Sequence, residues 1–386
     1  MIGELRWALL VVGLTLAFML QPLTVLAAPP ETEWNGEWSG EWGGEWGGYL
    51  AGGVDHYGSF YDQDGESDTT RAVLRNAKLQ LELAWGEQWQ AELDGSYQIA
   101  GDKKELDLGD AFLQFNGARR FRVTAGRFKE PFGLERLTSY TDLNTSERSV
   151  ATSAFAPGRS TGIMAGQFRK SATWALGVFT EEPDGGSTRA VTGRVTAAPV
   201  RSHARVLHLG LAASWRDLDH QRFQIRDEGE VFSADNIIRS PRFDARDAWL
   251  AGLEAAWLAG RLTLAGEAMM QSVQRSNGER WQFQGAYLQA SLFLTPDQRR
   301  YGRGEFKGVK PQHAAGAVEV VARHSTVDLR DRGIGAEAQV MLLGLNYYLG
   351  DQFQVRLNYL WPDISGNSLM ANPDGDAVTL RAVLSF

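Results

Sequence analysis

The chain has 386 residues, enough for two soluble domains or for one large barrel, and it contains 43 glycines and no cysteine. Its formal net charge of −8 argues against a nucleic-acid partner. The lack of cysteine is typical of proteins that cross an oxidising compartment, although many cytosolic proteins also lack it.

The N-terminus has the three parts of a secretory signal peptide. The segment MIGELR is followed by the apolar run WALLVVGLTLAFML and then by VLAAPP, which predicts a signal peptide over residues 1–27 with cleavage after Ala27. The alternative is an uncleaved anchor, since the apolar run is long enough to span a membrane. No later stretch approaches the roughly 18 apolar residues of a membrane helix, so the exported chain is expected to enter a membrane only as a barrel.

Residues 28–45 are rich in tryptophan and glycine. Trp34, Trp38, Trp42 and Trp46 are spaced by four, as on one face of a helix, but the glycines argue against a stable helix. We interpret this segment as a flexible periplasmic leader. The alternative is a tryptophan-mediated contact with cell wall, sugar or a neighbouring subunit.

From residue 46 to 386 the sequence alternates between apolar and polar residues in short runs, which predicts an all-β chain. One nearly apolar face and one polar face are typical of strands with lipid outside and water inside. We therefore predict a transmembrane antiparallel β-barrel of about sixteen strands. The predicted strands are 46–60, 71–84, 88–100, 105–117, 119–128, 161–170, 172–180, 188–199, 204–217, 246–258, 261–275, 279–295, 315–329, 335–349, 351–362 and 376–386.

The predicted connections differ between the two ends of this barrel. Connections at one end are short, whereas residues 129–160, 218–245 and 363–375 form long ones at the other. Residues 296–314 are an exception, because they are long and basic on the short side, and we expect them to fold back into the lumen. A sixteen-stranded barrel leaves an aqueous channel, so an inward-folded 129–160 loop is expected to narrow it and to select ions by charge.

An enzyme is the competing class, since some barrels hold a nucleophile beside a base. His324 precedes Ser325, but neighbouring strand residues point to opposite faces, so the two do not form a pair. No histidine or cysteine cluster has metal-ligand spacing. We therefore expect neither catalysis nor a cofactor or metal.

Three segments carry a resemblance to a known family. These are GRFKEPFGLERLTS followed by ERS within 126–149, VLHLGLAASWRDLD at 206–219, and FKGVKP followed by GAVEVVARHST within 306–326. Together with the C-terminal phenylalanine they resemble the phosphate-selective porin O and P family. The resemblance implies a passive anion channel of the outer membrane of a Gram-negative bacterium, with phosphate or polyphosphate as cargo.

The resemblance also implies where anions bind. By motif position, Arg136, Lys310 and Asp110 take the places of the family's central charged residues, with Lys129 beside them in the loop. Arg222 and Arg226 take the place of an arginine ladder, and Arg299, Arg300 and Arg303 are candidates for a further base. By strand parity, the wet face adds further bases to the anion path, namely Lys78, Arg122, Arg194, Arg216 and Arg356.

The chain departs from the family pattern in its acidic residues. Glu130 and Glu135 lie beside the bases of the 129–160 loop, and the next long connection holds Asp227, Glu228 and Glu230. A weakly selective general porin and a structural barrel that contacts the cell wall are therefore kept as alternatives. The resemblance further implies a homotrimer in contact with outer-membrane lipid, and Phe386 as the signal read by the barrel assembly machinery.

Overall fold

The computed structural model describes residues 42–58, 61, 69–101, 103–181, 188–202, 204–366 and 375–386. The expected signal peptide and leader residues 28–41 lie outside the described residues. Residues 42–45, which we expected in the leader, belong instead to the first strand. No helix among the described residues is long and apolar enough to span a membrane.

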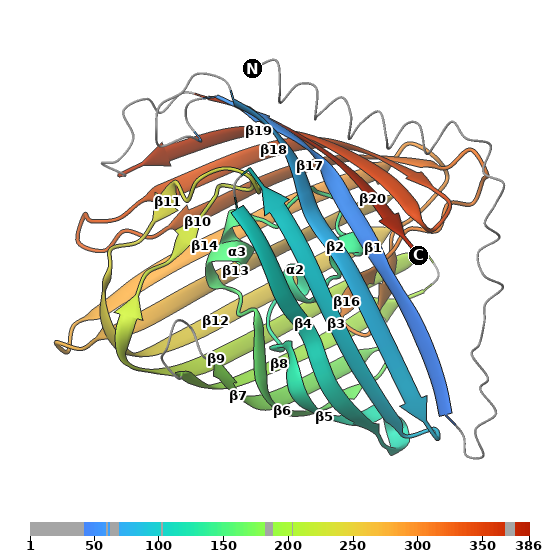
Figure 1. Cartoon of the computed structure of the whole chain (residues 1–386), viewed down its shortest axis with the longest axis horizontal. Coiled ribbons are helices and arrows are strands. Elements are labelled where there is room, and N and C mark those ends of the chain that lie inside the picture. The colour runs from blue at the N-terminus through green and yellow to red at the C-terminus, as the bar shows by residue number, and fades with distance from the viewer. Residues whose placement is uncertain are drawn as a thin grey trace.

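Sixteen antiparallel strands form a closed barrel, which confirms the predicted fold (Figure 1). Each strand pairs with its neighbour in chain order, and the last pairs with the first. The strands are β1 (Trp42–Tyr57), β2 (Thr69–Trp85), β3 (Trp89–Ala100), β4 (Lys103–Asn116), β5 (Phe121–Lys129), β6 (Arg159–Phe168), β7 (Ala172–Glu181), β8 (Thr188–Arg201), β9 (Arg205–Phe223), β12 (Phe243–Ala259), β13 (Leu262–Arg275), β14 (Arg280–Phe293), β17 (Ala317–Asp328), β18 (Glu337–Leu349), β19 (Phe353–Ser365) and β20 (Ala377–Ser385).

Alternation along each strand separates the two faces of the wall. On β18 the leucines at 343 and 345 are about half exposed outside, whereas Asn346 is fully buried inside. At the seam, the backbone of Phe386 exchanges hydrogen bonds of 3.0 and 3.1 Å with Gly48. Gly53 is required there, since a Cβ would lie 1.8 Å from the carbonyl oxygen of Leu380.

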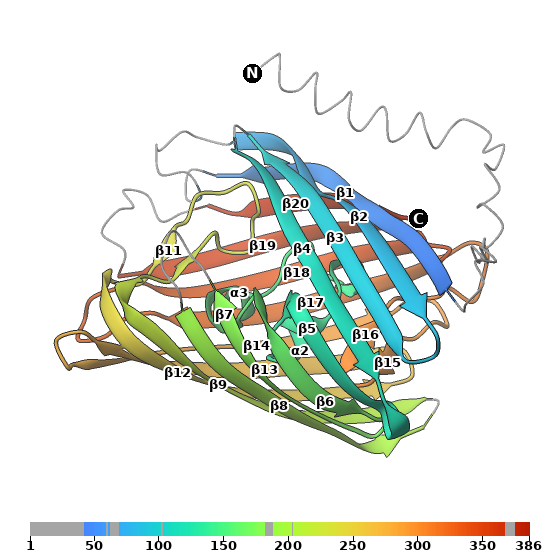
Figure 2. The same cartoon turned by 60° about the horizontal axis from the view of Figure 1, so that its bottom comes forward.

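Three connections fold toward the barrel interior (Figure 2). The inner loop, residues 130–158, contains α2 (Leu134–Leu137), η3 (Tyr140–Asp142) and α3 (Val150–Phe155). The mouth loop, residues 224–242, contains the two short strands β10 (Arg226–Asp227) and β11 (Ile238–Arg239). The lumen turn, residues 294–316, contains β15 (Arg300–Gly302) and β16 (Glu305–Lys307). A further short element of the described residues is η2 (Ala118–Arg120), between β4 and β5.

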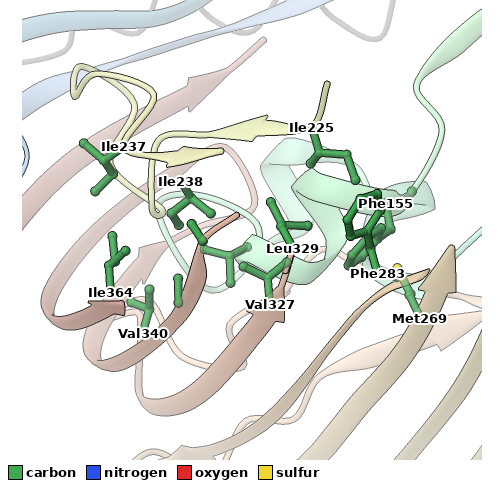
Figure 3. Packing of buried hydrophobic residues seen from close by; sticks show 14 of the residues in the cluster. Phe155, Ile225, Ile237, Ile238, Met269, Phe283, Val327, Leu329, Val340 and Ile364 are labelled. Atoms are coloured by element: carbon green, nitrogen blue, oxygen red, sulfur yellow. The ribbon is translucent and has the colours of Figure 1, made fainter. Parts of the chain in front are cut away.

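An apolar core lies inside the barrel on one side (Figure 3). Phe155 of α3, Ile225 of the mouth loop and Ile238 of β11 pack with wall residues such as Phe283 and Val327. Residues of this core are excluded from water, so the loops that carry them are fixed on this part of the wall. The open part of the lumen is therefore displaced toward the opposite side.

Candidate functional site

The first residue of the inner loop is tied to the wall by a buried ion pair. Glu130 is fully buried, and its carboxylate accepts hydrogen bonds from the guanidinium of Arg216 at 2.9 Å and from Thr192 at 2.5 Å. Ser160 donates a third hydrogen bond at 2.7 Å. These donors lie on β9, β8 and β6, so one carboxylate joins the loop to three strands.

A second buried cluster joins the inner loop to the mouth loop. Arg323 of β17 donates to Glu135 of the inner loop at 3.1 Å and also contacts the carboxylate of Glu230 in the mouth loop. Glu230 accepts a hydrogen bond from the backbone amide of Val150 at 3.0 Å. Removing Arg323 would leave two carboxylates buried without their cation, which is costly.

Polar side chains of the wall also bind the backbone of the inner loop. Glu267 of β13 accepts hydrogen bonds from the amides of Leu134 and Glu135, at 2.8 and 2.7 Å. Arg356 of β19 is fully buried and donates to backbone carbonyl oxygens of the loop, at 2.9 Å for Tyr140 and 3.1 Å for Thr145. The loop is thus held along its length against the wall.

The lumen turn is fixed in the same way, which confirms that it folds back into the barrel. Arg194 of β8 pairs with Glu254 of β12 at 2.6 Å and donates to the carbonyl oxygen of Gly304 at 2.8 Å. Phe306 of β16 packs against Leu134 of α2. The turn therefore reaches the inner loop inside the lumen.

A cavity of about 430 Å³ remains between the inner loop, the lumen turn and the wall from β2 to β8. Six basic and three acidic side chains line it. The basic ones are Lys78, Arg122, Lys129, Arg159, Arg194 and Lys307, and the acidic ones are Glu92, Asp110 and Glu305. The lining is therefore electropositive.

Two of these cations have no carboxylate partner among the described residues. The guanidinium of Arg122 lies over the ring of Phe168, 5.0 Å from its centroid. The ammonium of Lys129 donates to backbone carbonyl oxygens of the inner loop, at 3.0 Å for Arg136 and 3.4 Å for Leu137. A third contact, to the carbonyl oxygen of Thr138 at 3.5 Å, uses the last N–H donor of Lys129. Arg122 is therefore left to donate to an anion in the cavity, whereas Lys129 offers the anion its charge.

The acidic side chains of the cavity are mostly compensated. Asp110 makes a two-point ion pair with Arg159, at 3.0 and 2.8 Å, and Lys78 lies 2.7 Å from Asp94. The carboxylates of Glu92, Asp94 and Asp110 lie within 4.8 Å of one another. This acidic patch shares the wall with the cations, so charges of both signs face the passing ion.

The structure brings Lys129 and Asp110 together but not every predicted residue. Arg136 does not line the cavity, and its guanidinium donates to the carbonyl oxygen of Thr152 at 3.0 Å. Burial, and next the nearby Arg148, lower the pKa of Arg136 to about 9, so it remains cationic at neutral pH. Lys310 lies elsewhere: it is exposed on the lumen turn, 3.7 Å from Asp351 in the turn between β18 and β19.

Only some of the residues predicted for the anion path line the cavity. Lys78, Arg122 and Arg194 line the cavity, whereas Arg216 and Arg356 hold the inner loop. Arg222 is exposed and lies 3.6 Å from Asp244, and Arg226 is exposed beside Gln224. Arg300 and Arg303 are exposed on the lumen turn, and Arg303 is within electrostatic range of Arg122.

Sequence reasoning missed several residues that the structure brings to the site. Arg159, Glu92 and Lys307 line the cavity, and Arg323 and Glu267 anchor the loop. Glu92, Glu267 and Arg323 lie on predicted strands, so strand parity was a signal that could have placed them on the inner face. Arg159 and Lys307 lie in predicted connections, where parity gives no information, although the structure places them in β6 and β16.

The comparisons with known proteins identify the family. A model of the family described as phosphate-selective porin O and P matches residues 51–386. The chain belongs to this family. This porin is therefore a channel rather than an enzyme, and it lies in the outer membrane of a Gram-negative bacterium.

Two relatives are similar to this porin in sequence. Porin O of Pseudomonas aeruginosa is 23% identical over 385 residues, a match that covers 87% of each chain. An uncharacterized protein of Caulobacter vibrioides is 29% identical over 300 residues, which cover 70% of this chain but only 59% of that protein. The match thus spans less than two thirds of the Caulobacter relative.

Solved structures with a similar fold are outer-membrane proteins. An anion-selective porin from Comamonas acidovorans has a TM-score of 0.56 and 16% identity, covering 90% of this chain and all of that one. The channel DcaP of Acinetobacter baumannii has a TM-score of 0.56 and 11% identity, covering 90% and 98%. OmpT of Vibrio cholerae in trimer form has a TM-score of 0.55 and 8% identity, covering 90% and 100%. At these identities the likeness is one of fold.

Proposed function

We propose that this porin admits small anions by passive diffusion, with phosphate or polyphosphate as the favoured cargo. The observation that carries the proposal is the excess of basic over acidic side chains around the cavity, with Arg122 and Lys129 free of carboxylate partners among the described residues. Arginine and lysine donors replace part of the water around a phosphate oxygen. The family and the structurally similar anion-selective porin of Comamonas acidovorans also support selectivity for anions.

Three of the acidic residues that left the ion preference open do not line the cavity. Glu130 and Glu135 are buried and paired with arginines, as is Glu230 of the mouth loop. They neutralise structural cations, and their charges are not presented to the permeating ion. This arrangement favours an anion channel over the weakly selective alternative.

Block of chloride current by phosphate tests the cargo. In planar bilayers with chloride as the carrier, added phosphate is expected to reduce single-channel conductance in a saturable way, and pyrophosphate more strongly because it carries more charge. Sulfate at matched ionic strength is the control for general anion binding. Anion preference with no block by phosphate would leave an anion porin without phosphate selectivity.

We also propose that the porin assembles as a homotrimer and that Phe386 directs its insertion. The trimer form of the structurally similar OmpT supports the first part. Phe386 is half exposed on the outer face, 6.2 Å from the ring of Trp46, where an assembly factor can reach it. Native mass spectrometry tests the trimer, and insertion of a chain lacking Phe386 into the outer membrane of living cells tests the signal.

A further inference from the structure

The outer face of β9, β12, β13 and β14 carries a polar cavity that plays no part in the channel. It has a volume of about 470 Å³ and lies toward the end of the barrel that bears the mouth loop. Its lining residues are Trp215, Asp217, Arg246, Asp247, Trp249, Gln274 and Arg280. Because the long loops of a porin face outward from the cell, this cavity lies at the level of the outer leaflet.

Two arginines converge on one oxygen atom in this cavity. Arg246 donates to Oε1 of Gln274 at 2.7 Å, and Arg280 donates to the same atom at 3.2 Å. Two guanidinium groups held by one neutral acceptor repel each other, and an anion between them relieves that repulsion. Arg246 also pairs with Asp247 at 2.8 Å, whereas Arg280 forms no ion pair among the described residues.

Strand pairing extends the charged row to both sides. Asp217 of β9 stands opposite Asp247 of β12 and opposite Arg189 of β8. Arg189 is exposed and, within the described part of the chain, also forms no ion pair. The row therefore contains three arginines and two aspartates and is positive by one charge.

Directly below this row lies a pair of tryptophans. Trp215 and Trp249 are register partners, and Trp249 is 52% exposed on the outer face. Tryptophan is enriched where a membrane's headgroups meet its acyl chains. The arginines next to it are therefore at the height of lipid headgroups, which a phosphate of a lipid reaches and a protein partner in the aqueous phase does not.

Below the tryptophans the outer face becomes a groove. A second cavity of about 560 Å³ crosses β12, β13 and β14, with small residues at Ala251, Ala268 and Ala286, and its far rim on β17 and β18 carries Asp328 and Glu337. Register pairs Ala268 with both Leu253 and Ala286, so the floor is continuous across the three strands. The part of this groove over β12 and β13 is shallow and mostly apolar and lies next to a headgroup-level cation pair, so it suits one acylated, phosphorylated lipid whose chain keeps clear of the acidic rim.

We propose that this face binds a phosphorylated glycolipid of the outer leaflet, of the lipid A type. Its phosphate lies between Arg246 and Arg280, its sugar lies against Trp215 and Trp249, and an acyl chain lies in the groove over Ala251 and Ala268. The site depends on the outer-membrane location and is independent of which ion the channel carries. A lipid bound at this face would hold the porin at a set depth and orientation in the asymmetric outer membrane.

Lipid titration of the purified, delipidated porin tests the site. Binding of bisphosphorylated lipid A, its dephosphorylated counterpart and inorganic phosphate is measured by native mass spectrometry. We expect the double variant Arg246→Gln/Arg280→Gln to bind bisphosphorylated lipid A about tenfold more weakly, through loss of charge-assisted hydrogen bonds. The control Arg222→Gln/Arg332→Gln removes two exposed arginines outside the cavity and is expected to bind normally.

A groove variant tests the acyl chain separately. Ala251→Phe fills the groove while leaving both arginines in place, and it is also expected to weaken binding of lipid A. Equal binding of dephosphorylated lipid A, or unchanged binding by the double variant, overturns the proposal. Competition by inorganic phosphate as strong as that of the lipid also overturns it. A disulfide formed between protomers of the Trp249→Cys variant overturns it too, because it would place a second copy of the chain on this face.

Discussion

Individual charges in the lumen have different roles even where the side chains are alike. Arg122 faces the cavity over Phe168, whereas Arg216 and Arg356 are buried and bonded to the inner loop. We expect Arg122→Glu to lower the anion-to-cation permeability ratio roughly tenfold, since a unit charge at about 4 Å contributes about 1 kcal/mol even in water. Bilayer reversal potentials measure the ratio.

The matched control for this prediction is Arg332→Glu. The side chain of Arg332 is 59% exposed and pairs with Glu279, and neither residue lines the cavity. The same change of charge there is expected to leave selectivity unaltered. An equal fall in both variants would mean that total charge, and not the position of Arg122, sets the preference.

A second prediction at the residue scale concerns the buried pair of Glu130 and Arg216. Glu130→Ala leaves the guanidinium of Arg216 buried without its partner and is expected to destabilise the attached loop by about 3–5 kcal/mol. The expected result is a larger, noisier single-channel conductance, because the inner loop leaves the lumen part of the time. The double variant Glu130→Ala/Arg216→Met removes both charges and is expected to recover most of the wild-type current, whereas continued noise in it would show that the pair does not hold the loop.

At the scale of elements, we expect the stability of the mouth loop to depend on pH. Burial raises the pKa of Asp227 to about 7 and that of Glu228 to about 8. The packed loop therefore favours neutral carboxyl groups, and this stabilisation is complete below about pH 4, falls as the pH rises above that value, and is fully lost once the pH passes about 7 to 8. We expect trypsin to cut at Arg226 or Arg239 faster at pH 9 than at pH 6, beyond its own pH dependence.

The variant Asp227→Asn/Glu228→Gln keeps both side chains neutral at every pH. Its mouth loop is expected to be cut at the same low rate at pH 6 and pH 9, measured against an unstructured reference peptide. A pH dependence equal to that of the wild type would locate the titrating groups elsewhere.

The strands were predictable from sequence and the loop contacts were not. Alternation is a local property, so the predicted strand bounds lie within about four residues of the observed ones, except that β9 continues to Phe223, six residues past its predicted end. The inward lumen turn followed from its unexpected length. The inner loop, by contrast, is placed by partners far along the chain, such as Arg323 for Glu135 and Asn358 for Ser146. No local pattern specifies those pairs.

The dependence on partners far along the chain also explains why only part of the candidate site was predicted. Lys129 and Asp110 were predicted and do line the cavity, because a motif fixed their positions on the wall and at the loop entrance. Lys310 lies on the lumen turn, where its side chain is near Asp351 of the turn between β18 and β19. A small change in the length of a turn is enough to point a side chain in another direction, so the motif did not fix the position of Lys310. Strand parity placed Arg216 and Arg356 on the inner face, but it does not distinguish a residue facing water from one covered by a loop.

For the whole molecule, the loops divide the interior into two parts. The apolar core with Phe155 and Ile238 occupies the side of β12 to β20, and the charged cavity follows β2 to β8. A wide barrel thereby becomes a narrow, off-centre passage with a positive lining. Its selectivity depends on the buried ion pairs that keep Glu130, Glu135 and Glu230 from facing the passage.

Ion preference is tested most directly by the reversal potential of the wild-type porin in a planar bilayer across a steep KCl gradient. The charged lining of the cavity predicts a potential of the sign set by chloride, and a shift toward zero in Arg122→Glu. A potential of the opposite sign, showing potassium to be the more permeant ion, would contradict the assignment of this cavity as an anion passage.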